Sequence, residues 1–147
     1  MAEAAGLRLP VCLATKFPPK IGTTGELPFV VEQKHAIDFA TDGMPAVLST
    51  PNLIGLLERT ARKALEPFLE PDERSVGMEI ELRHLAPTPL GRQVTCSARV
   101  IHVDGTKISF QIEARDETGL IARGLHKRAV IRVQSFANQV QRRQGNC

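Results

Sequence analysis

The clearest pattern in the chain is a helical one that begins near residue 50. Apolar residues recur there at steps of three and four, which is typical of a helix that buries one face. These residues are Leu53, Ile54, Leu57, Ala61 and Leu65. Thr50 can cap the N-terminus, Pro51 suits the first helical turn, and Pro67 and Pro71 end the helix. The pattern predicts an amphipathic helix of about four turns.

Strands are predicted on both sides of this helix. The apolar run over residues 27–37 predicts a first strand, and residues 38–49 predict a loop or short helical turns. After residue 75 the period becomes two, which predicts strands over 75–86 and 92–103. A third strand lies between the turns at Asp104-Gly105 and Asp116–Gly119, and a fourth covers 120–133. We expect these four to form an antiparallel meander.

The fold class that follows is α+β, with the helix covering one face of the sheet. We expect residues 1–26 to form an irregular N-terminal arm, residues 27–136 the domain, and residues 137–147 a polar, frayed C-terminal tail. A single layer of long strands leaves edges and apolar surface exposed. We therefore expect a dimer, in which a second subunit covers the exposed edge and the apolar surface.

Composition narrows the function classes. The 147 residues suit one domain, and the absence of Trp and Tyr disfavours nucleic-acid binding by base stacking. A net charge of +3 favours an anionic ligand such as a nucleotide phosphate, although a merely solubilising surface explains it too. Three widely spaced cysteines indicate neither a disulfide framework nor a metal site. No signal peptide or membrane span is evident, so we expect a cytoplasmic protein with reduced thiols.

Three polar residues stand out against this pattern. Glu58 follows Ile54 by four residues, so it lies at the edge of the apolar stripe, on the side of Thr50. His84 continues the apolar series of its predicted strand, which consists of Val76, Met78, Ile80 and Leu82. Each has an ordinary explanation: a helix cap for Thr50, a solvated stem for Glu58, and a hydrogen-bonded structural residue for His84. We nevertheless expect the carboxylate, the imidazole and the hydroxyl to meet in one cleft, because burying a charge without a partner is costly.

Gly77 is a fourth candidate. The alternation places it on the parity opposite to the apolar face of its strand. A glycine inside a strand often marks a close approach of a ligand to the backbone, and a bulge is the alternative.

These residues give the chain a resemblance over about residues 27–136. It resembles the hotdog-fold thioesterases, in the branch typified by fluoroacetyl-CoA thioesterase. The segments that carry the resemblance are residues 50–58, 75–77, 84–91 and 116–124, with His126 and Arg128. The spacings of Thr50, Glu58 and His84 are similar to those of that branch.

The resemblance implies a long helix wrapped by a sheet of about five strands, and a dimer with active sites at the subunit interface. It implies catalytic roles for Thr50, Glu58 and His84, and a backbone N–H of Gly77 that binds the thioester carbonyl. Glu58 could attack directly or activate water. No cofactor or metal is implied.

The substrate expected is a short or medium acyl-CoA thioester. The branch has an aromatic lid before the catalytic threonine, whereas residues 38–49 here contain only Phe39, with Met44 nearby as a substrate contact. We therefore expect an acyl group other than fluoroacetyl. Arg123, Lys127 and Arg128 are candidates for binding the CoA phosphates, although a solvated charged edge explains them as well. The alternative function is a non-catalytic acyl-CoA-binding or sensing protein of the same fold.

Overall fold

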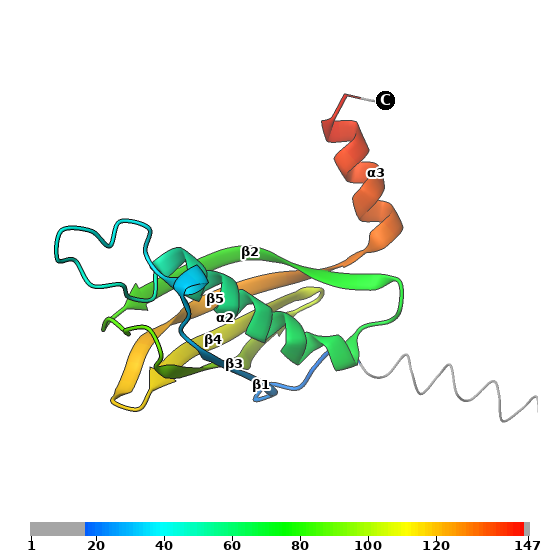
Figure 1. Cartoon of the computed structure of the whole chain (residues 1–147). Helices are drawn as coiled ribbons and strands as arrows, with labels where there is room; N and C mark the ends of the chain where they lie inside the picture. The colour runs from blue at the N-terminus through cyan, green and yellow to red at the C-terminus, as the bar shows by residue number, and fades with distance from the viewer. Residues whose placement is uncertain (1–16, 146–147) are drawn as a thin grey trace, which may run out of the picture.

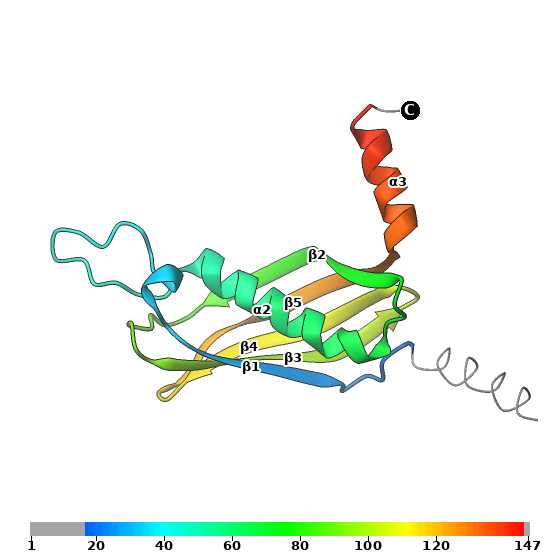
Figure 2. The ribbon, with the colours of Figure 1, turned by 45° about the vertical axis from the view of Figure 1, so that its right-hand side comes forward.

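Five antiparallel strands form one sheet, and the long helix α2 crosses one face of it (Figures 1 and 2). The structure is a computed structural model that describes residues 17–145. The strands are β1 (Thr24–Val30), β2 (Glu73–His84), β3 (Gln93–Asp104), β4 (Lys107–Asp116) and β5 (Gly119–Arg132). The helices are α2 (Thr50–Leu65), α3 (Val133–Arg143) and the short 3₁₀ turns η1 (Gln33–His35) and η2 (Glu66–Phe68). This confirms the α+β class and the long helix on a five-stranded sheet.

The strand order is β1-β3-β4-β5-β2, so the predicted four-stranded meander is wrong in one respect. Only β3, β4 and β5 follow one another across the sheet, and β2 pairs with β5 instead of β3. Helix α2 carries the chain from β1 at one edge of the sheet to β2 at the other. Within one chain, β2 therefore has a free edge.

The core lies between α2 and the inner face of the sheet. The predicted apolar stripe of α2 is largely confirmed, since Leu53, Leu57, Ala61 and Leu65 are fully buried. The inward side chains of β4 are fully buried as well, as the alternation predicts. They are Ile108, Phe110, Ile112 and Ala114. Burying an aliphatic or aromatic side chain of this size stabilises the fold by about 1.5–3 kcal/mol.

A bulge in β2 changes which of its residues face the helix. Gly77 pairs with Arg128 and Glu79 with Lys127, so Met78 is an extra residue. Position 77 therefore faces α2, whereas the alternation in the sequence placed Gly77 on the opposite face of the strand. Met78 was expected to be buried and is 48% exposed instead. After the bulge, Ile80, Leu82 and His84 face inward, as predicted.

Several boundaries differ from the predictions. The first strand begins at Thr24, within the expected arm, and ends at Val30 rather than near residue 37. The last strand ends at Arg132, and the stretch that we expected to become a frayed tail forms α3. Figures 1 and 2 show α3 projecting away from the sheet. Of the expected arm, residues 1–16 lie outside the described part of the chain.

Residues 17–145 contain no helix that is long and apolar enough to cross a membrane. The same residues contain no group of three or more His, Cys, Asp or Glu side chains that could hold a metal ion.

Candidate active site

Thr50 and His84 form a hydrogen-bonded pair at the N-terminal end of α2. The helix is capped by Ser49, whose Oγ accepts a hydrogen bond from the backbone N–H of Asn52 at 3.2 Å. The interpretation of Thr50 as the cap is therefore wrong, and its hydroxyl is free for another partner. Thr50 Oγ1 lies 2.8 Å from Nδ1 of His84, the last residue of β2. Helix and strand thus hold the two side chains together.

The other ring nitrogen of His84, Nε2, is buried and has no hydrogen-bond partner among residues 17–145. An unsatisfied buried polar group costs about 1–3 kcal/mol, so a site of this kind suits a group that arrives with the substrate. Burial lowers the pKa of His84 below its ordinary value of 6.5, which favours the neutral imidazole at neutral pH. A neutral ring can either donate or accept at Nε2, depending on its tautomer.

The pair opens onto an apolar hollow of about 350 Å³. Its lining comes from the loop over residues 38–48, from the end of β2 and from the residues just after it. The side chains include Ile37, Phe39, Met44, Val47, Leu85 and Ala86. Met44, which was expected to contact substrate, therefore lies in the same hollow as Thr50 and His84. An apolar hollow with a few convergent polar groups is the usual form of a small-molecule site.

Glu58 lies two turns further along α2, under the inner face of β2. A side chain at position 77 would place its Cβ closer than 3.0 Å to Glu58 Oε2, so the glycine makes room for this carboxylate. The carboxylate also lies 3.9 Å from Arg128 Nη1, and the Glu58 side chain is 41% exposed. Glu58 is thus held between a strand glycine and a guanidinium, and it remains open to solvent.

Arg128 is buried, whereas it was expected at the exposed mouth of a phosphate site. It is 5% exposed and faces α2 from β5. Its Nε donates to Ser75 Oγ at 2.9 Å, and its Nη2 donates to the Ser75 carbonyl at 2.8 Å. Burial lowers the pKa of Arg128, and the nearby charge of Glu58 opposes this effect. With these partners, the guanidinium is held beside Glu58, in a hollow that Arg59 and Arg62 also line.

His126 completes this inward cluster. Its Nε2 lies 3.2 Å from Arg128 Nη1, and its Nδ1 lies 2.8 Å from the carbonyl of Glu79. The guanidinium can only donate, so Nε2 accepts and Nδ1 carries the proton. Burial lowers the pKa of His126, in keeping with that neutral ring. Ser75 and His126 had no predicted role. The sequence did contain one signal for this cluster: His126 and Arg128 are two polar residues at inward positions of β5.

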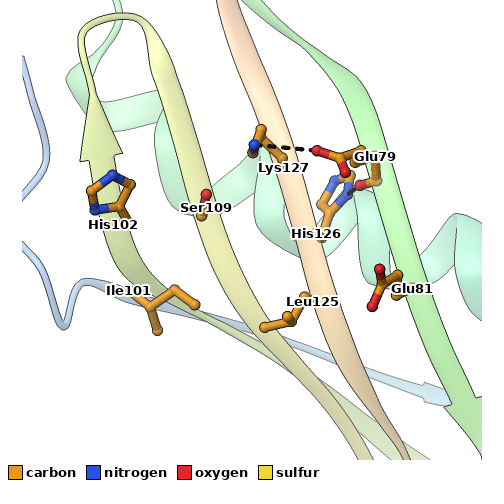
Figure 3. Close-up of a pocket in the computed structure, with 8 residues that line it drawn as sticks. All are labelled: Glu79, Glu81, Ile101, His102, Ser109, Leu125, His126 and Lys127. Atoms are coloured by element: carbon orange, nitrogen blue, oxygen red, sulfur yellow. Dashed lines mark hydrogen bonds and ion pairs between the residues drawn. The ribbon is translucent and has the colours of Figure 1, made fainter.

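Arg123 and Lys127 lie on the other face of the sheet. Figure 3 shows Lys127 on that face, with α2 behind the sheet and an ion pair to Glu79 at 3.2 Å. A second hollow of about 310 Å³ lies here, lined by Ile101, His102, Ser109 and Leu125 among others. Arg123 borders a separate depression with Glu81 and Arg83. Neither cation adjoins the hollow that contains Thr50 and His84.

The predicted catalytic residues thus form two groups within one chain. Thr50 and His84 share one hollow, while Glu58 lies in another with Arg128. Eight residues of helix separate Thr50 from Glu58, which is about 12 Å along the axis. One chain by itself does not bring all three side chains to the same point.

Comparison with known proteins agrees with this fold. The sequence profile of the fluoroacetyl-CoA-specific thioesterase family matches residues 30–134. The fluoroacetyl-CoA thioesterase of Streptantibioticus cattleyicolor is 37% identical over 99 residues, which cover 67% of this chain and 71% of that protein.

Solved structures give the same result. A structure of fluoroacetyl-CoA thioesterase is similar with a TM-score of 0.78 and 32% identity, covering 85% of this chain and 97% of that one. A thioesterase superfamily member from Thermus thermophilus has a TM-score of 0.80 at 26% identity, covering 88% of this chain and 96% of that one. The chain therefore belongs to the fluoroacetyl-CoA-specific thioesterase family and is a thioester hydrolase with the hotdog fold.

Proposed function

We propose that the protein hydrolyses a short or medium acyl-CoA thioester to the free acid and CoA, in a site that two subunits complete. The observation that carries this proposal is the His84 ring. Its Nδ1 is held by Thr50, while its buried Nε2 is unpaired beside an apolar hollow. A related fluoroacetyl-CoA thioesterase variant is described in complex with fluoroacetate and CoA, which supports a CoA thioester as the substrate class.

A homodimer would unite the two groups of residues. β2 is the longer of the two edge strands of the sheet, and a free edge of twelve residues is a template for pairing with a second copy. In an antiparallel β2–β2 pair, His84 at the end of one strand lies beside the first half of the partner strand. That half contains Gly77, and Glu58 of the same subunit lies beneath Gly77. The carboxylate of one subunit would then face the Thr50–His84 pair of the other.

Four residues of the two groups have distinct roles in the proposed reaction. Glu58 either attacks the thioester carbonyl to form a mixed anhydride, which water then hydrolyses, or removes a proton from the attacking water. The carbon–sulfur bond breaks, and a proton that the water gives up passes through Nε2 of His84 to the leaving thiolate of CoA. The backbone N–H of Gly77 is the proposed donor to the carbonyl oxygen as it becomes negative. Arg128 keeps the carboxylate in place.

The hollow indicates an apolar acyl group. Apart from Thr50 and His84 its walls are apolar, and Met44 is a flexible side chain that adapts to different shapes. Arg123 and Lys127 are proposed contacts for the CoA phosphates. This requires the nucleotide portion of CoA to reach the outer face of the sheet. A buried, unpaired Cys96 is in keeping with a cytoplasmic protein.

Release of free CoA thiol from a panel of acyl-CoAs tests the function. We expect hydrolysis by the wild type and a loss on the order of 10²-fold or more in Glu58→Gln. Glu117→Gln is the matched control, because it makes the same change in an exposed turn carboxylate. Equal rates for wild type and Glu58→Gln would remove Glu58 from the mechanism. Binding of acyl-CoA without thiol release would favour the sensing protein instead.

A further inference from the structure

Helix α3 presents an apolar stripe that residues 17–145 leave uncovered. The stripe consists of Val133, Phe136 and Val140, which recur at steps of three and four residues. None of the residues of α3 is buried, and Phe136 is 37% exposed. An isolated helix of eleven residues is marginal in water, and most helices gain stability by packing an apolar face. The stripe therefore indicates a packing partner.

The position of α3 shows where that partner lies. The helix starts next to the beginning of β2, where the Val133 N–H donates to the Asp72 carbonyl at 2.9 Å and Arg132 pairs with Asp72 at 2.7 Å. From there it extends past the free edge of β2, away from β1, in both views (Figures 1 and 2). Whatever covers the stripe must lie beyond that edge, on the side where the proposed second subunit pairs.

The two-fold relation of such a pair determines which part of the second subunit α3 would meet. The start of β2 in one subunit lies beside the end of β2 in the other. Just beyond that end are the hollow of Thr50 and His84, the exposed Leu85, and the loop over residues 38–48 with its exposed Phe39 and Met44. These apolar side chains form the open rim of the hollow.

The charges of the two segments are complementary. The loop over residues 38–48 contains Asp38 and Asp42 and no Lys or Arg. Helix α3 contains Arg142 and Arg143 in its last turn and no Asp or Glu. Opposite charges at the rim of an apolar contact favour this pairing and its orientation.

We propose that α3 of each subunit docks on the loop over residues 38–48 and on Leu85 of the partner subunit, and so forms the outer wall of the partner's acyl pocket. Phe136 is the central contact. The inference rests on the proposed dimer and extends it, because each active site would be closed by a helix of the other subunit. Covering the rim excludes water from the thioester and adds apolar surface for the acyl chain.

Cysteine cross-linking tests this contact. The protein is the full chain with Cys12 and Cys147 changed to Ser, and Cys96 stays because it is buried. We expect Phe136→Cys with Met44→Cys to form a disulfide-linked dimer under mild oxidation. Ser135→Cys with Met44→Cys is the control, because residue 135 lies on the polar side of α3 and should give little cross-link.

Kinetics provide the second readout. We expect Phe136→Ser with Val140→Ser to remain dimeric by light scattering and to raise the KM for acyl-CoA about tenfold. Failure of the Phe136–Met44 cross-link in a protein that is dimeric and active overturns the α3 contact while leaving the proposed function intact. A monomer overturns both the dimer and the contact. Binding of the wild type, but not of the Phe136–Val140 variant, to phosphatidylglycerol vesicles would also overturn it, by assigning α3 to a lipid surface.

Discussion

Replacing Gly77 by Ala adds one methyl group at the point where β2 passes over the carboxylate of Glu58. The new Cβ would lie closer than 3.0 Å to Glu58 Oε2, a separation that real Cβ atoms essentially never show. It would also lie 3.4 Å from His126 Cε1 and 3.6 Å from Arg128 Nη1. Those two groups are anchored by hydrogen bonds, whereas the carboxylate is the free end of a flexible side chain. The carboxylate is therefore what must move.

The size of the movement predicts separate effects on activity and on stability. Restoring ordinary contact requires a shift of roughly 1 Å, since non-bonded heavy atoms settle at about 3.5 Å. A displacement of about 1 Å at a reacting group can lower the rate about 10²-fold. The backbone N–H of residue 77 is kept, and the half-exposed carboxylate can move into solvent, so we expect a change in unfolding free energy of less than about 1 kcal/mol.

A double-mutant cycle in the thiol-release assay tests the mechanism. We expect Gly77→Ala to lower kcat/KM about 10²-fold in the wild-type background and only a few-fold in the Glu58→Gln background, because the displaced group is then already disabled. Thermal unfolding of each variant controls for loss of fold. Full activity of Gly77→Ala, or an equal loss of kcat/KM in both backgrounds, would refute a displacement of the Glu58 carboxylate.

Three further predictions concern the titratable groups. Burial lowers the pKa of both His84 and His126, so the acidic limb of kcat/KM against pH should lie below 6.5, and a limb above 6.5 would contradict a neutral, buried His84. The unfolded chain binds more protons than the folded one just below pH 6.5, so the thermal midpoint should fall as the pH drops through that region, which scanning calorimetry would measure. Burial raises the pKa of Cys96 to about 12, so iodoacetamide at pH 8 should alkylate this thiol far more slowly in the native protein than in urea, as read by peptide mass spectrometry; comparable rates would mean that the core around Cys96 opens readily.

Periodicity was sufficient for much of the architecture. The stripe from Leu53 to Leu65 predicted α2, and the alternation from Ile108 to Ala114 predicted the buried face of β4. These patterns are local and strong, because a helix or strand that buries one face must repeat its apolar residues at the period of its own geometry. The candidate residues Thr50, Glu58 and His84 emerged in the same way, as polar side chains at or beside apolar positions.

Other features depended on contacts between distant segments. The pairing of β2 with β5, rather than β3, follows from the path of α2 across the sheet. The bulge at Met78 turns Gly77 toward Glu58. The inserted residue shifts the alternation by one position, and the apolar residues Val76 and Met78 hid this shift in the sequence. A neighbouring serine caps α2, which leaves the Thr50 hydroxyl for His84.

The sequence by itself determined the helix, the buried face of β4 and the three polar side chains that we propose as catalytic. Only the tertiary structure decided how they are grouped: Thr50 with His84 in one hollow, and Glu58 with Gly77 and Arg128 in another. It also showed Arg128 to be buried and α3 to extend beyond the free edge of β2. The physical reason is that residue spacing determines a face of one element, whereas distance between elements depends on strand order and register, which the whole chain settles together.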